Sequence, residues 1–301
     1  MVDQHDDKNG LRIAVIGAGP AGVYSSDIFL RQLRKEGEKL GVGTDARIDL
    51  FEKLRAWRAE EAREQGAFKA SNEAISNDGL THVYGSNVGK MLLETCGTGL
   101  WTQIKAAAAA GSDARMSGSL LPVVINSGSG NQGMTVSLPV IVFAKNRNIP
   151  HEKLIRALVI SNLTAIHQKT RIGRLSAYCG ATSAGAGAGA GICYLYGGRY
   201  DEIAHTVVNA LAINSGMLCD GAKASCAAKI ASAVEAGLLG MQMYRHDSQF
   251  YGGDGIVVKG VENTIRAVSS IARDGMRETD NEIIRLMIGR ELTEDESHHR
   301  M

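Results

Sequence analysis

Proline is scarce in this sequence of 301 residues: it occurs four times, and never after Pro150. Aromatic residues are also few, at 5%, whereas glycine occurs 36 times. These numbers argue against a core built around large rings. We expect helices whose backbones lie close together, because glycine and alanine leave little side-chain volume between them.

An excess of charge of one sign is also lacking. Lys and Arg number 33 against 32 Asp and Glu, a formal net charge of +1, which gives no electrostatic reason to bind nucleic acid or a membrane surface. No run of eighteen apolar residues suggests a membrane span, and the polar start, Met1 to Lys8, does not resemble a secretory leader. The five cysteines, an odd number, indicate reduced thiols. We therefore expect a cytoplasmic protein with no nucleic-acid or membrane partner.

The N-terminal segment has the pattern of a dinucleotide-binding unit. After a predicted disordered tail at 1–10, an apolar run at 11–16 reads as a strand, 23–34 as a helix, and 46–52 as a second strand. The turn between the first strand and the helix contains Gly17, Gly19 and Gly22, and the second strand ends at Glu52. Glycines at this spacing allow a tight turn and close approach of a phosphate, and the acid is placed to bind a ribose hydroxyl. We predict a short βαβ Rossmann-like fragment at 11–54.

This fragment resembles the start of the FAD-containing ferredoxin–NADP reductases. The resemblance implies FAD as a cofactor and Gly17, Gly19, Gly22 and Glu52 as its binding residues. The reading that we favour over this one is a fragment that binds no nucleotide, because one βαβ unit buries too little surface to hold a large cofactor firmly. The resemblance stops near Leu54, where a charged helical run at 55–67 follows. We interpret that run as a linker helix at the junction of two pieces.

From residue 68 to 290 the pattern predicts a helical domain, followed by a disordered tail at 291–301. Helices are expected at 151–170, 200–218, 223–239 and 281–287. Between Ala184 and Gly191 alanine and glycine alternate strictly. We interpret this tract as a buried helix whose small side chains permit close helix contact, because tertiary packing can offset the helix-weakening effect of glycine. The predicted fold class is mainly α, with the βαβ fragment in front.

Four of the five cysteines lie between Tyr178 and Cys226. On one straight helix Cys219 and Cys226 would be roughly 10 Å apart along the axis, too far to share one small metal centre. Asp220 and Gly221 offer a turn, with Asp220 as the helix N-cap. Cys219 would then precede the helix and Cys226 would lie within it. The spacing alone leaves a metal site and ordinary buried cysteines as alternatives.

A polar loop rich in glycine and amide side chains precedes another expected helix at 134–146. Small residues expose backbone N–H groups, and a helix N-terminus favours anions, so the loop is suited to hold a substrate carboxylate. A plain connector is the alternative reading. The predicted substrate-binding residues are Asn126, Ser127, Gly128, Ser129, Gly130, Asn131 and Gln132.

Several long motifs, in the same order, resemble the C-terminal part of the iron–sulfur L-cysteine desulfidases, relatives of the α chain of bacterial iron–sulfur L-serine dehydratases. The resemblance covers about 68–287. It rests on Asn126-Ser-Gly-Ser-Gly-Asn-Gln-Gly133, Gly173-Arg-Leu-Ser-Ala-Tyr-Cys-Gly-Ala181, Gly185-Ala-Gly-Ala-Gly-Ala-Gly191, Gly216-Met-Leu-Cys-Asp-Gly-Ala-Lys-Ala-Ser-Cys226 and Gly275-Met-Arg-Glu-Thr-Asp280.

The resemblance implies a [4Fe-4S] cluster held by Cys179, Cys219 and Cys226, with one iron open to substrate. The implied reaction converts L-cysteine to pyruvate, ammonia and sulfide, with L-serine as the alternative substrate. Lys223 is a candidate for the base and Asp220 for orienting the substrate ammonium, although both residues could simply cap and solvate the helix.

The desulfidases carry an N-terminal half that this chain lacks, which indicates a truncated or chimeric lyase. A flavin- or nicotinamide-dependent oxidoreductase and an inactive helical scaffold remain the alternative functions. A homodimer is compatible with every one of these readings.

Overall fold

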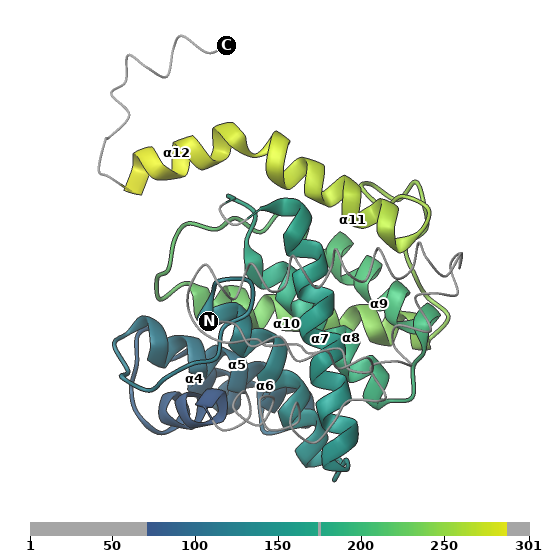
Figure 1. Cartoon of the computed structure of the whole chain (residues 1–301). Coiled ribbons are helices and arrows are strands. Elements are labelled where there is room, and N and C mark those ends of the chain that lie inside the picture. Colours follow the sequence, from purple (N-terminus) through teal and green to yellow (C-terminus); the bar gives the residue numbers. More distant parts are fainter. Residues whose placement is uncertain (1–70, 174–175, 288–301) are drawn as a thin grey trace, which may run out of the picture.

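A computed structural model describes residues 71–173 and 176–287 (Figure 1). Residues 71–81 are helical. The elements that follow are α4 (Val88–Cys96), α5 (Leu100–Met116), α6 (Gly130–Asn146), α7 (His151–Ile172), α8 (Gly180–Leu195), α9 (Tyr200–Ile213), α10 (Cys226–Arg245), α11 (Val261–Ser270), the π-helical turn η2 (Ile271–Gly275) and α12 (Arg277–Met287).

The described part of the chain confirms the prediction of a mainly helical fold. It contains no strand, only two isolated antiparallel bridges, Asn126 with Ser129 and Tyr178 with Leu218. Among these residues, no helix combines the length and the apolar character that a membrane crossing needs. The predicted tails, linker helix and βαβ fragment lie outside the described residues, and so do Gly17, Gly19, Gly22 and Glu52.

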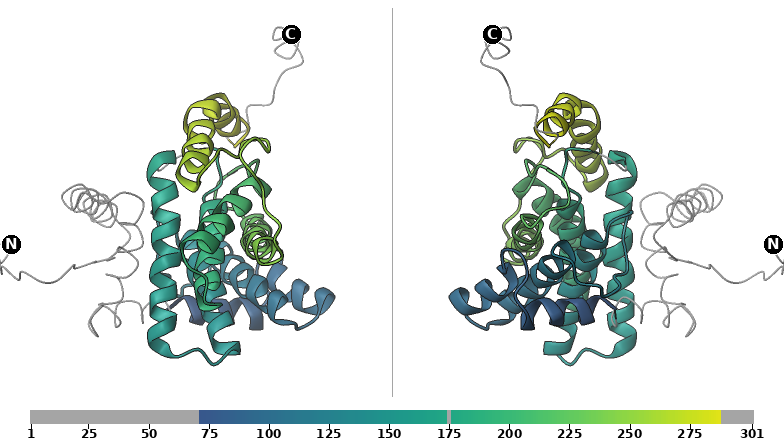
Figure 2. Two further views of the ribbon diagram at one scale, coloured as in Figure 1. Left: turned by 90° about the vertical axis from the view of Figure 1, so that its right-hand side faces the viewer. Right: turned by 90° about the vertical axis from the view of Figure 1, so that its left-hand side faces the viewer.

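The helix α8 forms the centre of the fold. It packs against α6, α7, α9 and α10, and every residue from Ala181 to Cys193 is buried. Around this centre, α4 and α5 lie at one end of the molecule and α11 and α12 at the other (Figure 2). The last helix, α12, has no buried residue and is the most peripheral of the described elements.

The alternation of glycine and alanine explains how α8 fits. A methyl group added to Gly185 would lie 2.2 Å from the carbonyl oxygen of Ala233 in α10, and one on Gly189 would lie 2.6 Å from that of Gly237. The intervening glycines face α7: a methyl group on Gly187 would lie 2.5 Å from the carbonyl oxygen of Ser161. Residues four apart share one helix face and residues two apart lie on nearly opposite faces. The predicted buried helix is therefore confirmed, with two glycine faces that let two neighbours approach its backbone.

Several boundaries differ from those expected. The α9 helix ends at Ile213 and not at 218, because residues 217–219 leave the helix and hydrogen-bond to residues 177–179. The α10 helix begins at Cys226, so Cys219 precedes the helix as predicted. The expectation that Asp220 is its N-cap is wrong, because Ser225 holds that position and Asp220 forms an ion pair with Lys229.

Candidate metal centre and substrate loop

Two of the predicted ligand cysteines meet where the chain pairs with itself before α8. The Cys179 N–H donates to the Met217 carbonyl at 3.0 Å, and the Cys219 N–H donates to the Ala177 carbonyl at 2.6 Å. These bonds flank the bridge between Tyr178 and Leu218, so segments forty residues apart in sequence become neighbours. Cys179 is the N-cap residue of α8, and its side chain interacts with that of Cys219.

The environment of Cys219 favours a thiolate. Its pKa is lowered to about 6, first because Cys179 hydrogen-bonds to the thiolate, and further through the Gly221 N–H and the charges of Lys169 and Lys229, while burial acts in the opposite direction. The pKa of Cys179 is raised, because it is the donor in that pair and is buried beside another anion. Thiolate is the form of cysteine that binds metal, so the pair has one sulfur ready for a ligand role at neutral pH.

Cys226 faces the same loop from the first residue of α10. Its Sγ donates a weak hydrogen bond to the Gly221 carbonyl at 3.4 Å, and its charge acts on both Cys179 and Arg115. Within 71–173 and 176–287, however, no group of three or more His, Cys, Asp or Glu side chains is arranged around a point as one metal ion requires. Sulfur ligands of a single tetrahedral ion lie only about 4 Å apart, since each bond is about 2.3 Å long. The arrangement thus disfavours a single-ion site, whereas a multi-iron cluster uses more widely separated thiolates.

Three basic side chains from different helices surround these thiols. Lys169 in the last turn of α7 is only 7% exposed, and burial lowers its pKa while Cys219 and Cys179 raise it. Lys229 in α10 and Arg115 in the last turn of α5 provide the other two positive charges. A thiolate-bound cluster carries negative charge, so these cations suit it electrostatically. The sequence did not single out Lys169 or Lys229, because Lys169 is ten residues from Cys179 and Lys229, three residues after Cys226, resembles an ordinary helix-surface lysine.

The predicted substrate loop is a tight turn that opens α6. Asn126 and Ser129 exchange backbone hydrogen bonds of 3.1 and 3.0 Å, with Ser127 and Gly128 at φ 50° and 84° between them. Ser129 caps α6, because its side chain accepts from the Gln132 N–H at 3.4 Å. Asn126 is buried and donates to the Asn162 side chain in α7 at 2.9 Å, so its amide fixes the loop to the core.

The N-termini of α6 and α8 are adjacent, which places the loop beside the cysteines. A methyl group on Gly180 would lie 2.5 Å from Nε2 of Gln132, so Gln132 covers the residue that follows Cys179. The Asn131 side chain accepts a hydrogen bond from the Arg115 guanidinium at 3.1 Å. The structure therefore brings Asn131 and Gln132 to the cysteine site, whereas Asn126 has a structural hydrogen bond elsewhere.

The two residues considered for proton transfer and orientation lie in the loop between Cys219 and Cys226. Lys223 is exposed, so the burial that would prepare a lysine as a base is not present. Asp220 is exposed as well and forms its ion pair with Lys229. Both residues are close to the thiols in sequence, but their observed surroundings are those of a solvated loop.

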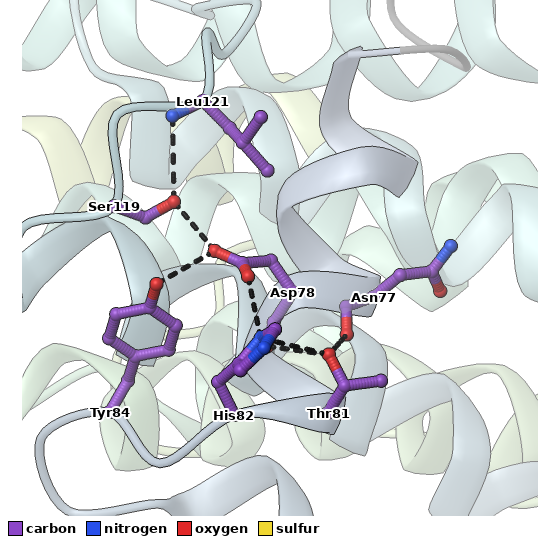
Figure 3. Close-up of polar contacts among 7 residues, drawn as sticks. All are labelled: Asn77, Asp78, Thr81, His82, Tyr84, Ser119 and Leu121. Atoms are coloured by element: carbon purple, nitrogen blue, oxygen red, sulfur yellow. Dashed lines mark hydrogen bonds and ion pairs between the residues drawn. The ribbon is translucent and has the colours of Figure 1, made fainter.

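A second polar cluster lies on the neighbouring surface (Figure 3). The Asp78 carboxylate accepts from the Ser119 hydroxyl at 2.7 Å and from the Tyr84 hydroxyl at 3.0 Å, and it contacts the His82 ring nitrogen at 2.9 Å. Hydrogen bonding, first from Ser119, lowers the pKa of Asp78. Ser119 and His82 both contact the carboxylate and not each other, so the geometry is not that of a serine nucleophile activated by histidine. The cluster ties the turn after 71–81 to the chain after α5.

Taken together, the described residues define a helical protein whose glycine-packed core holds a pair of interacting cysteines beside a polar, cation-lined helix terminus. The profile of the family named Serine dehydratase alpha chain matches residues 33–285, and the chain belongs to this family. The match begins inside the 11–54 segment and crosses the expected junction at 55–67 without a break. It therefore gives no support to a separate reductase-like piece.

Several curated relatives share this sequence. A UPF0597 protein of Desulfitobacterium hafniense is 52% identical over 284 residues, which cover 94% of this chain and 63% of that protein. UPF0597 proteins of Lachnoclostridium phytofermentans and Finegoldia magna are 56% and 52% identical, each over 72% of this chain and 52% of the relative. The chain thus spans between about half and two thirds of the length of these relatives. No solved structure matches it.

Proposed function

We propose that this chain forms part of an iron–sulfur-dependent lyase that removes the β substituent from a small amino acid. L-cysteine, converted to pyruvate, ammonia and sulfide, is the proposed substrate, with L-serine as the alternative. Membership of the Serine dehydratase alpha chain family supports an elimination of this kind. Because the chain spans only part of its relatives, other segments can contribute to the complete activity.

The single observation that carries the proposal is the contact between Cys179 and Cys219 beside Lys169 and Lys229. Cys179, Cys219 and Cys226 would hold a [4Fe-4S] cluster, because cysteine thiolates are the usual ligands of such clusters. When bound, such a cluster supplies a Lewis acid that polarises the leaving group.

Residues of this chain would bind the substrate and move its proton. The loop from Ser127 to Gln132 binds and orients the substrate beside Cys179, since the α6 N-terminus favours a carboxylate. A base then removes the α proton while the bond between the β carbon and sulfur breaks, and the sulfur leaves with the bonding electrons as sulfide. The resulting aminoacrylate reacts with water to give pyruvate and ammonia. Lys223 is the proposed base and Asp220 one proposed partner of the ammonium group; both lie exposed in the loop between Cys219 and Cys226.

The test is iron content after anaerobic purification and reconstitution of the full chain. We expect about four irons per chain in the wild type, and loss of most of that iron in Cys219→Ala, because a ligand thiolate is missing. Cys96→Ala is the matched control, since Cys96 is exposed and lies at the end of α4. Equal iron in Cys219→Ala and the wild type would refute the ligand assignment. A wild-type chain that binds no iron would refute the proposal as a whole.

A further inference from the structure

Arg115 is a half-buried cation held against the first turn of α6. Its Nη1 donates to the Asn131 side chain at 3.1 Å. A methyl group placed on Gly130 would lie 2.5 Å from Nε and 3.0 Å from Cζ of the same guanidinium, so the group rests directly on the backbone of Gly130. The missing side chain at Gly130 and the hydrogen bond that Arg115 donates to Asn131 together fix the orientation of Arg115.

No carboxylate pairs with Arg115 in the described ranges. The ion pairs there involve other residues, and the ionisable group that acts on Arg115 is Cys226. Burial disfavours the charged guanidinium and lowers the pKa of Arg115, and the nearby Cys226 offsets this lowering only in part. A partly desolvated guanidinium is stabilised by an anion, and its planar fork matches the two oxygens of a carboxylate.

Gln132 provides a second and independent indication of a ligand. It is only 8% exposed, and its Oε1 has no hydrogen-bond partner among the described residues. A buried carbonyl oxygen without a donor costs free energy, so a donor from a ligand would satisfy it. Gln132 lies in the same helical turn as Asn131 and covers Gly180, the residue next to Cys179.

An α-amino acid carries a carboxylate and an ammonium group on one carbon. We infer that Arg115 and Gln132 bind this head group, with Arg115 holding the carboxylate and the Gln132 carbonyl accepting a hydrogen bond from the ammonium. The inference rests on the proposed function, because it names the substrate class of the same site. It explains why a cation from α5 that lacks an acidic partner and an acceptor in α6 that lacks a donor both lie at the first turn of α6, beside Cys179. The side chain of the bound amino acid then extends toward the cysteines.

The experiment is calorimetric titration of the anaerobically purified full chain with L-alanine. This ligand has the complete head group but no leaving group on its β carbon, so it binds without reacting. Propionate lacks the ammonium and ethylamine lacks the carboxylate. We expect L-alanine to bind at least about tenfold more tightly than either fragment, the usual scale for losing a hydrogen bond to a charged group. No binding of L-alanine overturns the inference, and propionate binding as tightly as L-alanine overturns the role of Gln132.

Two variants test the residues themselves. Arg115→Gln and Gln132→Leu should each weaken L-alanine binding by about tenfold or more. Arg147→Gln is the matched control, because Arg147 is exposed at the opposite end of α6, and it should bind as the wild type does. Wild-type affinity in Arg115→Gln overturns the inference. If Arg115→Gln does not fold, Arg115→Lys decides, since it keeps the charge and loses the fork: weaker binding supports the inference and unchanged binding overturns it.

Iron content, measured on the same samples, separates this inference from the proposed function. Loss of iron in Arg115→Gln with unchanged L-alanine affinity would mean that Arg115 only balances the charge of the thiolates, and the inference fails. A wild-type chain without iron or sulfide release, in which Arg115→Gln still loses L-alanine, would refute the lyase and leave the amino-acid site standing.

Discussion

Two glycine-rich segments of this molecule use glycine for different physical reasons. In α8, Gly185 has an ordinary helical backbone but no room for a side chain, since the Ala233 carbonyl would lie 2.2 Å from its methyl group. In the loop before α6, Gly128 has open space around it but a φ of 84°, which side chains rarely allow. The first glycine is required by tertiary packing and the second by local backbone geometry. The comparison shows that glycine abundance alone does not reveal which constraint applies.

The largest effect should come from Gly185→Ala. Alanine favours a helix by about 1 kcal/mol over glycine, yet the obstacle here is a backbone carbonyl that cannot move away cheaply. We expect a loss of about 3 kcal/mol in the free energy of unfolding, at the upper end of overpacking costs. Urea denaturation of iron-free protein measures it. Gly216→Ala is the control, because Gly216 has open space and no positive φ, and its effect should stay within about 0.5 kcal/mol.

A smaller effect is expected from Gly128→Ala. A left-handed residue other than glycine costs roughly 1–2 kcal/mol, and no clash adds to that cost here. Asparagine adopts this conformation more readily, so Gly128→Asn should recover most of the loss in the same urea measurement. If Gly128→Asn is as unstable as Gly128→Ala, backbone conformation is not the constraint at this position and the comparison with α8 fails.

The helices α4 and α5 pack as closely as α8 packs against its neighbours, and a buried carboxyl group lies in their contact. Gly89 fits against α5, where a methyl group would lie 2.7 Å from the Ala106 carbonyl, and its N–H donates to the Asp113 carboxylate at 3.0 Å. Asp113 is 1% exposed, and burial raises its pKa above the ordinary value of 3.8, although the Gly89 and Val88 N–H groups oppose the shift. A helix contact that excludes water therefore has a titratable side chain within it.

The smallest effect should be the pH dependence that Asp113 contributes. Because its folded-state pKa is raised, the group stabilises the fold below about pH 3.8, and this stabilisation is lost as pH rises through the folded value. The stability of the wild type relative to Asp113→Asn should therefore fall as the pH rises from 4 to 7. Urea denaturation at pH 4, 5.5 and 7 provides the measurement. Asp274→Asn, whose exposed carboxyl has a lowered pKa, should give a weak trend of opposite sign.

Much of the helical body follows from local sequence. The helix expected at 151–170 is found at His151–Ile172, because Pro150 precedes it, an apolar face runs along it and Gly173 follows it at φ 101°. The break between Cys219 and Cys226 was also predictable from Asp220 and Gly221, since Gly221 has a φ of 95°. The end of α9 was not predictable, because it depends on pairing between 177–179 and 217–219. The N-cap of α10 was also missed, because Asp220 pairs with Lys229 and leaves that position to Ser225.

Among the proposed site residues, the polar loop and the cysteines were visible in the chain, whereas Arg115 and Lys169 were not. Arg115 follows a run of alanines in α5, and Lys169 lies in an otherwise unremarkable amphipathic helix. Each looks like a helix-terminal cation until the fold places it beside Cys226 or the pair formed by Cys179 and Cys219.

Local patterns in the chain were enough to predict that this protein is built from helices with very small residues at their contacts, and that its thiols and amides are concentrated in a few short motifs. It could do so because helical periodicity, glycine backbone freedom and turn chemistry act over only a few residues. The tertiary structure alone decided which helix ends meet, and so which cations and which amide surround the thiols. That choice depends on contacts between residues far apart in the chain, where the shape of the glycine faces of α8 fixes the positions of its neighbours.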